Sequence, residues 1–419
     1  MSALPLGQSR PVLILGASAR ISIPIARSLQ KCGVAVDVAH LSKTDPKFRS
    51  RAVRECILLP DFREHPAEML DSLTSLIRSR GYDTLIPVQD GAAQIVAENY
   101  SVLSSLLRVA SPPPHVLRRV LDKDATLRVA RQCGIPIPRS YTVATPAELG
   151  AVASELTFPV VMKPSVHNGQ PSFKVRYFEH IDHLKMALTE NRCGPVLLQE
   201  YCAGEGVGVE MLIHQGACLA TFQHRRLKEG PASGGVAVMA ISEEPDPVLA
   251  EDSLKLLRAL EWEGVAMVEF RRNPANGRYA LMEVNGRYWG TSSLPILAGL
   301  DFPAYQWRLL HDADPRIPSS YKAGLRWRWT AGYISRLHDI LLRSGKGPGR
   351  RPSRIDELLR LPLDFAPSIQ DALWSFHDPL PSIVELWQTL RQWAAADLRG
   401  ALRKILPKRS FSRRIQDAG

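Results

Sequence analysis

Short apolar runs alternate with amphipathic stretches along the first hundred residues of the chain. Residues 11–15 form a fully apolar run, a helical pattern then extends to Leu29, and residues 34–39 and 84–88 are further apolar runs. Such alternation is typical of parallel strands buried in an open α/β sheet. The turn after the first run contains Gly16 but no G-x-G-x-x-G motif. The pattern therefore predicts a Rossmann-like framework without a dinucleotide site.

Asp90 follows the run 84–88, at the point where open α/β sheets place their ligands. It is therefore a candidate substrate-site residue. Asp90 also suits the N-cap of a helix that begins near Ala92, and the sequence leaves both interpretations open.

After residues 111–114, a proline-rich segment expected to be a stiff linker, the pattern changes. A capped helix starts near residue 121 and stops at Gly134, and a later apolar run ends in Lys163. An ammonium group at the end of a buried Val-Val-Met run is costly to desolvate unless an anion meets it. Lys163 therefore indicates contact with an anion, and phosphate is the obvious candidate.

Two apolar runs, 265–270 and 279–285, flank a dense cluster of turn-forming residues and predict an antiparallel hairpin. Glu283 and Asn285 are two residues apart, so they share a face of their strand, and the expected register brings Glu269 opposite Glu283. Two carboxylates and an amide carbonyl suit a hard cation such as Mg²⁺. From the pattern alone, a solvent-exposed face of an edge hairpin is an equally good interpretation.

The Glu-x-Asn at the end of this strand, its acidic partner one hairpin earlier and the following Gly-Arg resemble the metal-binding end of ATP-grasp enzymes. That resemblance implies that Glu269, Glu283 and Asn285 hold Mg²⁺ or Mn²⁺. It also implies that Arg287 holds a carboxylate or a developing acyl phosphate. The usual family motif has proline where this chain has Gly286, which leaves the backbone before Arg287 freer.

Further motifs occur in the order that the family shows. The resemblance implies that Lys123 and Lys163 contact the phosphates of ATP and that residues 165–172 close over them, although this loop has a single glycine, Gly169. A strand at 195–202 precedes the linker that holds adenine in ATP-grasp proteins. The residues implied in binding adenine and ribose are Gln199, Glu200, Tyr201, Cys202 and Glu205.

A basic strand at 221–228 runs into a loop rich in Gly, Pro and Ser. This arrangement fits a flap over an acyl phosphate or carboxylate, with Arg225 or Arg226 as the charged clamp. A charged edge strand with a loose hairpin is the structural alternative.

Composition agrees with a globular protein of two or three domains, since 45% of the 419 residues are hydrophobic and 23% are charged. No apolar run approaches the ~20 residues that a membrane span needs, and the first ten residues are too polar for a signal peptide, so we expect a cytoplasmic protein. The six cysteines show no Cys-x-x-Cys spacing and are expected to be reduced core thiols.

The net charge of +11 is concentrated in the last hundred residues. Residues 383–405 repeat apolar side chains at helical spacing among Arg, Lys and Gln, which predicts a long basic amphipathic helix. We expect this helix to pack on the body of the protein. Peripheral contact with a membrane or a partner is the alternative, a homodimer stays open, and nucleic acid is not expected.

Together these features predict an α/β protein with three parts. These are a Rossmann-like pre-ATP-grasp domain at 1–110, a two-lobed α+β ATP-grasp domain at 111–315 and a basic helical extension at 316–419. The resemblance, closest to the carbamoyl phosphate synthetase large chain and D-aspartate ligase, implies an ATP-dependent carboxylate–amine ligase. Its substrates would be a small carboxylate and an amine. Alternatives are an enzyme that makes carboxyphosphate or another acyl phosphate without an amide, a nonenzymatic nucleotide-binding protein and, least favoured, an NAD-dependent oxidoreductase.

Overall fold

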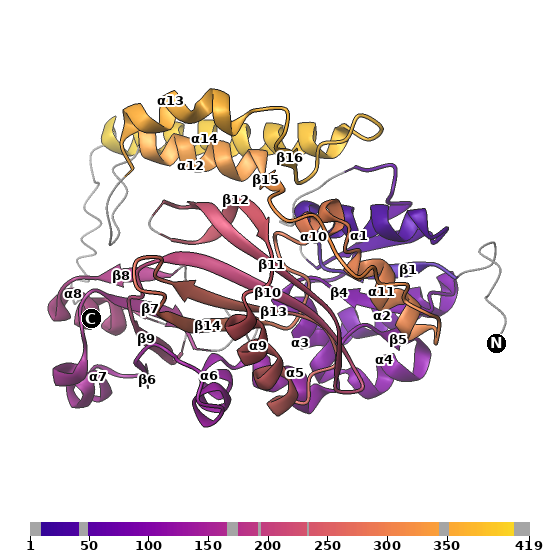
Figure 1. Ribbon diagram of the computed structural model, residues 1–419, viewed down its shortest axis with the longest axis horizontal. Coiled ribbons are helices and arrows are strands. Elements are labelled where there is room, and N and C mark those ends of the chain that lie inside the picture. Colours follow the sequence, from indigo (N-terminus) through magenta and orange to yellow (C-terminus); the bar gives the residue numbers. More distant parts are fainter. Residues whose placement is uncertain are drawn as a thin grey trace, which may run out of the picture.

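The computed structural model describes residues 10–41, 49–165, 175–191, 194–232, 234–342 and 352–405, with side chains up to residue 394 (Figure 1). The predicted phosphate loop at 165–172 lies outside these residues apart from Ser165, as does the basic tail beyond residue 405. Among the described helices, none combines the length and the apolar character that crossing a membrane requires.

Five parallel strands form the first sheet, in the order β3-β2-β1-β4-β5. The parallel α/β sheet predicted for this region is confirmed, and its central strand is fully buried because it has no polar residue to expose. Its strands are β1 (Val12–Leu15), β2 (Val36–His40), β3 (Glu55–Leu58), β4 (Thr84–Pro87) and β5 (Arg108–Val109). Its helices are α1 (Ala19–Lys31), α2 (Pro66–Arg80), α3 (Asp90–Glu98) and α4 (Tyr100–Leu106).

The predicted linker at 111–114 is one residue too long. Pro114 is instead the first residue of α5 (Pro114–Leu121). Proline suits this position because its fixed φ is helical and because the backbone N–H groups of the first turn make no hydrogen bond within the helix. The next helix, α6 (Lys123–Gln132), is capped as predicted, since the side chain of Asp122 accepts from the backbone N–H groups of Asp124 and Ala125.

A second, smaller sheet follows, with antiparallel strands in the order β6-β9-β7-β8 and a core of its own. In Figure 1 it lies on the opposite side of the molecule from the first sheet. Its strands are β6 (Ser140–Val143), β7 (Val160–Pro164), β8 (Arg176–Phe178) and β9 (Val196–Glu200). Its helices are α7 (Pro146–Val152), the 3-10 turn η1 (Ala153–Glu155) and α8 (Ile181–Thr189).

The largest sheet lies between these two, in the order β14-β13-β10-β11-β12-β15-β16 (Figure 1). It is antiparallel except for its last pair, β15 and β16. The core under it continues into that of the first sheet, so the two sheets share one apolar interior. Its strands are β10 (Glu205–His214), β11 (Ala217–Gly230), β12 (Val236–Glu243), β13 (Gly264–Arg272), β14 (Tyr279–Asn285), β15 (Arg326–Arg328) and β16 (Gln370–Asp371).

The helical pattern of residues 293–311 does not form one continuous helix. Two helices occur instead, α10 (Ser293–Ala298) and α11 (Phe302–Leu310), in addition to α9 (Pro247–Ala259) earlier in the chain. Gly299 ends the first of them with φ 108°, a conformation that glycine adopts without strain, and Asp301 caps the second. Gly299 and Asp301 both favour an interruption of the helix between residues 298 and 302, which the apolar periodicity alone does not predict.

The chain after residue 316 does more than add helices. It supplies β15 and β16 to the largest sheet and the helices α12 (Thr330–Leu342), α13 (Arg354–Asp364) and α14 (Leu380–Ile405), which lie together above β12 in Figure 1. Lys228 of β11 joins this layer to the sheet through ion pairs of 2.8 Å with Glu357 and 2.5 Å with Asp364.

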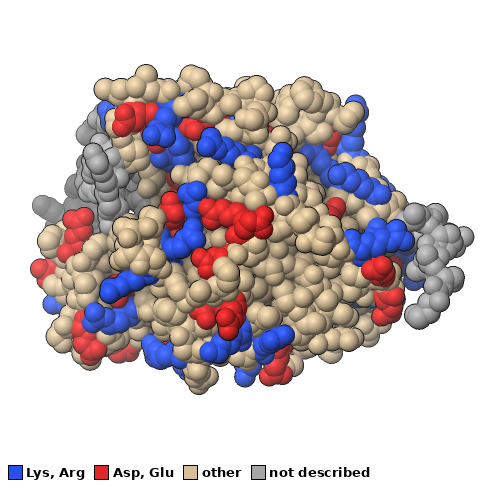
Figure 2. Space-filling view, in the orientation of Figure 1, with Lys and Arg blue, Asp and Glu red and all other residues tan. Residues whose placement is uncertain are grey.

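The long helix α14 packs on the body of the protein through a narrower face than its apolar pattern predicts. Glu385 accepts a hydrogen bond of 2.8 Å from the indole of Trp329, and Trp393 stacks on His338 with a centroid distance of 4.3 Å. Ile383 and Leu390, expected in the packed face, are 52% and 43% exposed. On the face in Figure 2, the upper edge of this layer carries few charged side chains. Contact of this surface with a membrane or a partner stays a prediction.

Burial raises the pKa of the Glu385 carboxyl to about 7 from its ordinary 4.5. A carboxyl whose pKa is raised by folding stabilises the fold below pH 4.5 relative to higher pH, and that stability is lost as pH rises through 7. We expect Glu385→Gln, which can still accept from Trp329, to melt like the wild type at pH 5. At pH 8 the variant should be more stable, by on the order of 2 kcal/mol. Parallel melting curves for the two proteins from pH 5 to 8 would contradict the shift.

Candidate functional site

A cleft of about 740 Å³ lies where the three sheets meet, a volume typical of small-molecule sites. One end is formed by the small sheet and the segment that follows it, including Lys163, Tyr177 and residues 200–202. The other end is formed by loops at the carboxyl ends of β1 and β4. Residues from β11, β13 and β14 form the middle of the cleft.

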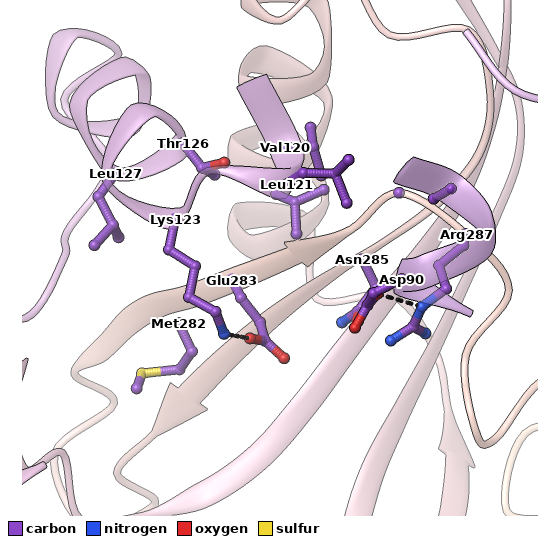
Figure 3. Close-up of a pocket in the computed structure, with 13 residues that line it drawn as sticks. Asp90, Val120, Leu121, Lys123, Thr126, Leu127, Met282, Glu283, Asn285 and Arg287 are labelled. Carbon is purple, nitrogen blue, oxygen red and sulfur yellow. Dashed lines mark hydrogen bonds and ion pairs between the residues drawn. The ribbon is translucent and has the colours of Figure 1, made fainter. Parts of the chain in front are cut away.

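The hairpin in the middle of the cleft has the register predicted from the sequence. Glu269 of β13 pairs directly with Glu283 of β14, and both line the cleft together with Asn285. A bulge next to this pair takes Met282 out of the regular pairing, because Phe270 lies opposite Leu281. Figure 3 shows Glu283 meeting the side chain of Lys123, which extends from the neighbouring helix.

Each of the two carboxylates is held by a cation of the chain. Lys123 Nζ lies 2.6 Å from Glu283 Oε2, and Arg226 forms an ion pair with Glu269 and a second, at 3.1 Å, with Glu229. Burial alone would lower the pKa of Arg226, but its two carboxylate partners raise it. Each carboxylate thus has a basic side chain of the protein as its partner.

This donor set is suited to a hard divalent cation. Two opposed carboxylates and an amide oxygen give the oxygen ligands that Mg²⁺ and Mn²⁺ prefer, and a bound cation would replace the charge of Lys123 and Arg226. No cluster of three or more His, Cys, Asp or Glu side chains that could hold a metal occurs among the described residues. The ligand set of Glu269, Glu283 and Asn285 contains only two such side chains.

Lys163, at the end of β7, has no carboxylate within ion-pair distance among the described residues. Its Nζ donates to Gln199 Oε1 at 2.8 Å, and burial together with nearby Lys123 lowers the pKa of Lys163 to about 8. The structure thus gives this ammonium a neutral partner and leaves its charge uncompensated. An anion in the cleft would compensate it, as expected from the sequence.

Asp90 and Arg287 form an ion pair across the cleft. Arg287 Nε donates to Asp90 Oδ1 at 2.6 Å (Figure 3), and this carboxylate raises the pKa of Arg287 against the opposing effect of burial. The alternative of Asp90 as a helix N-cap is wrong, because Gln89 occupies that position and Asp90 lies in the first turn of α3. Gly286 precedes Arg287 where a Cβ would come within 2.5 Å of the Trp262 ring, so the site has room only for glycine.

The two candidate clamp arginines lie on opposite faces of β11, as neighbours on a strand do. Arg226 lines the cleft, whereas Arg225 pairs with Glu205 at 3.1 Å and with Glu243 at 2.5 Å, and neither Arg225 nor Glu205 lines the cleft. Arg226 is therefore the clamp residue that the structure brings to the site. A ribose contact of Glu205 has no geometric support here.

The expected adenine segment lies at the small-sheet end of the cleft. Glu200, Tyr201 and Cys202 line it, while Gln199 is buried behind them and faces Lys163. The ring of Tyr201 meets Tyr177 edge to face with a centroid distance of 6.1 Å. These half-buried residues form a partly aromatic wall of the kind that holds a flat base.

Two groups at the cleft were missed from the sequence. Arg20 lines it from the first turn of α1, and the carboxyl-end rule that identified Asp90 applies to the loop just before it. His224 lines the cleft from β11 and pairs at 2.6 Å with the buried Glu210, whose pKa burial raises. No local sequence signal indicates the pair of His224 and Glu210, because its two members lie on different strands and meet only in the folded sheet.

Comparison with known proteins finds similarity over parts of the chain. Residues 192–333 match the family described as "ATP-grasp in the biosynthetic pathway with Ter operon". The carbamoyl phosphate synthase large chain of Methanobrevibacter smithii is 23% identical over 234 residues, 53% of this chain and 22% of that protein. The N-terminal section of the Methanopyrus kandleri large chain is 26% identical over 210 residues, 48% of this chain and 36% of that protein. The chain thus matches only a minor part of the length of these relatives.

Solved structures show the same fold. The L-amino acid ligase of Bacillus licheniformis has a TM-score of 0.58 and 18% identity, over 74% of this chain and 75% of that one. The biotin carboxylase of Campylobacter jejuni, in complex with an ATP analogue, has a TM-score of 0.60 and 14% identity, over 76% and 74%. The third is the biotin carboxylase domain dimer of Hydrogenobacter thermophilus 2-oxoglutarate carboxylase, solved with MgADP and bicarbonate. Its TM-score is 0.60 and its identity 14%, over 76% of this chain and 74% of that one. Residues 192–333 therefore match an ATP-grasp family, and about three quarters of the chain shares its fold with these solved structures.

Proposed function

We propose that the protein is an ATP- and Mg²⁺-dependent carboxylate–amine ligase. The observation that carries this proposal is the order of groups along one cleft. An uncompensated lysine and an aromatic wall lie at one end, opposed carboxylates in the middle, and arginines from β11, the β14 end and α1 beyond them. From one end of the cleft to the other, that order suits the base of a nucleotide, then its phosphates, and then an anionic substrate.

In the proposed reaction, a carboxylate oxygen of the first substrate attacks the γ-phosphorus of ATP, and the bond to the β–γ bridging oxygen breaks to release ADP. The nitrogen of the amine then attacks the carbonyl carbon of the acyl phosphate. Phosphate leaves and the nitrogen loses a proton, so the products are an amide, ADP and phosphate. Such phosphoryl transfer needs alignment and charge neutralisation more than a protein nucleophile.

The residues of the cleft have separate tasks in this scheme. Lys163 and Lys123 would neutralise phosphate oxygens, and the backbone of residues 200–202 would hold the base. Glu269, Glu283 and Asn285 would hold Mg²⁺ or Mn²⁺, which when bound supplies further neutralisation of the transferred group. Arg287 and Arg226, fixed by Asp90 and Glu229, would orient the acid and its acyl phosphate.

A screen of the full chain for ADP release tests the proposal. With Mg²⁺ and ATP, pairs of small carboxylates and amines are compared with each member alone. We expect release of ADP and phosphate in equal amounts only with both members present, and a product whose mass equals acid plus amine minus water. Equal ADP release without the amine would instead indicate an enzyme that makes an acyl phosphate. ATP binding without any turnover would favour a nonenzymatic role.

A further inference from the structure

Among the described residues, Arg20 is the arginine at this cleft that lacks an anionic partner. Its side chain lines the cleft, yet among the described residues it forms no ion pair, and its Nη1 is buried without a hydrogen-bond partner. The neighbouring arginines differ in this respect, since Arg226 pairs with two glutamates and Arg287 pairs with Asp90. A buried guanidinium without an anion is costly, so its presence at a binding cleft needs an explanation.

The guanidinium is held firmly in one orientation. It stacks on the ring of Trp329 at 4.1 Å, and the indole N–H of Trp329 is in turn fixed by Glu385 of α14. On Gly290, a Cβ would come within 2.6 Å of the Arg20 guanidinium carbon, so a larger residue there would displace the guanidinium from this position. Three distant segments therefore cooperate to position one side chain, which is typical of a binding group held ready for its ligand.

The local charge balance indicates the kind of ligand. Burial lowers the pKa of Arg20 to about 10, with Arg287 and Arg226 adding to the effect, so the group stays protonated at neutral pH. Glu385 attracts it but lies beyond ion-pair distance, and its own pKa near 7 leaves it partly neutral. One guanidinium in excess matches a single negative charge, and its planar fork matches a carboxylate.

We propose that Arg20 binds a free carboxylate of the substrate, distinct from the carboxylate that becomes phosphorylated. This inference rests on the proposed ligase function for the role of its ligand. The substrate at this end of the cleft would then be an amino acid or a dicarboxylic acid. Ser18, Gln89 and Thr291, which line the same end, offer hydrogen bonds to its uncharged polar groups.

The first test measures binding and needs no turnover. The full chain, with Mg²⁺ and a nonhydrolysable ATP analogue, is titrated calorimetrically with malonate and with inorganic phosphate. We expect malonate to bind, Arg20→Gln to weaken it by about tenfold or more, and Arg20→Lys to recover part of the loss. Arg27→Gln is the control, because Arg27 lies on the same helix but pairs with Asp378 away from the cleft. Equal malonate affinity in wild type and Arg20→Gln, no malonate binding, or tighter binding of phosphate would each overturn the carboxylate assignment.

The second test uses turnover. L-amino acids and their amides are compared as substrates for ADP release, with a dicarboxylic acid and its monoamide as the second pair. Arg20→Gln should raise the KM of the free-carboxylate member about tenfold or more and remove the preference over the amide, with the KM of ATP unchanged. No preference for the free carboxylate in the wild type would contradict the proposal. If no pair gives turnover while malonate binding still depends on Arg20, the ligase function fails and the carboxylate site stands.

Discussion

Glu283→Gln is expected to reduce Mg²⁺-dependent ADP release by about a hundredfold or more, while the protein still folds. The substitution removes one of two opposed carboxylates and with it a full negative charge beside the proposed cation site. An amide in the same place can still accept a hydrogen bond from Lys123, which now lies 2.6 Å from the carboxylate. The fold should therefore keep its melting temperature within a few degrees.

The matched control for this variant is Glu263→Gln. Glu263 also forms a close ion pair, at 2.7 Å with His214, but it does not line the cleft. Its substitution should leave turnover and its dependence on Mg²⁺ concentration unchanged. Wild-type activity in Glu283→Gln would dismiss the metal assignment, and loss of the cooperative melting transition would make the effect structural.

Lys163→Ala is expected to weaken binding of a nonhydrolysable ATP analogue by about tenfold to a hundredfold in calorimetry. Because the pKa of Lys163 is lowered to about 8, the ammonium loses its proton within an accessible pH range. Affinity of the wild type for the analogue should therefore fall as pH rises from 7 to 9. In Lys163→Ala that fall should disappear, whereas Lys163→Arg, which stays charged, should bind equally well at both pH values.

Lys185→Ala serves as the control for this series, since Lys185 is exposed on α8, which covers the same small sheet. Its substitution should change neither the affinity nor its pH dependence. If Lys163→Ala bound the analogue as tightly as the wild type, the lysine would have no contact with the phosphates.

The sequence predicted those parts of the site that depend on local pattern. Alternation along two strands and a turn between them determine which side chains face each other, so the pairing of Glu269 with Glu283 could be inferred. The bulge at Met282 could not, because the alternation of apolar and polar residues gives no signal for an extra residue in the strand. The cap of α6 and the place of Lys163 next to the last residue of β7 also follow from local signals.

What the sequence could not provide are contacts between distant segments. Lys123 and Glu283 are 160 positions apart, and Asp90 and Arg287 are 197 apart. Period-two alternation indicates that Arg225 and Arg226 face opposite ways, but only the neighbouring strands decide which of them reaches the cleft. The place of Arg20 after the first strand is a local signal, but its contacts with Trp329 and its fit beside Gly290 come from segments far along the chain.

The ion pairs on Glu269 and Glu283 make the binding of metal and of nucleotide depend on each other. A bare divalent cation that approaches these carboxylates must displace Lys123 and Arg226, which leaves positive charges in a partly buried place without partners. A triphosphate brings the negative charge that these side chains then require. The cation and the nucleotide should accordingly enter as one preformed complex, and each should raise the affinity for the other by the same factor. Because of this counter-ion exchange, free divalent metal should bind weakly to the cleft when no nucleotide is present.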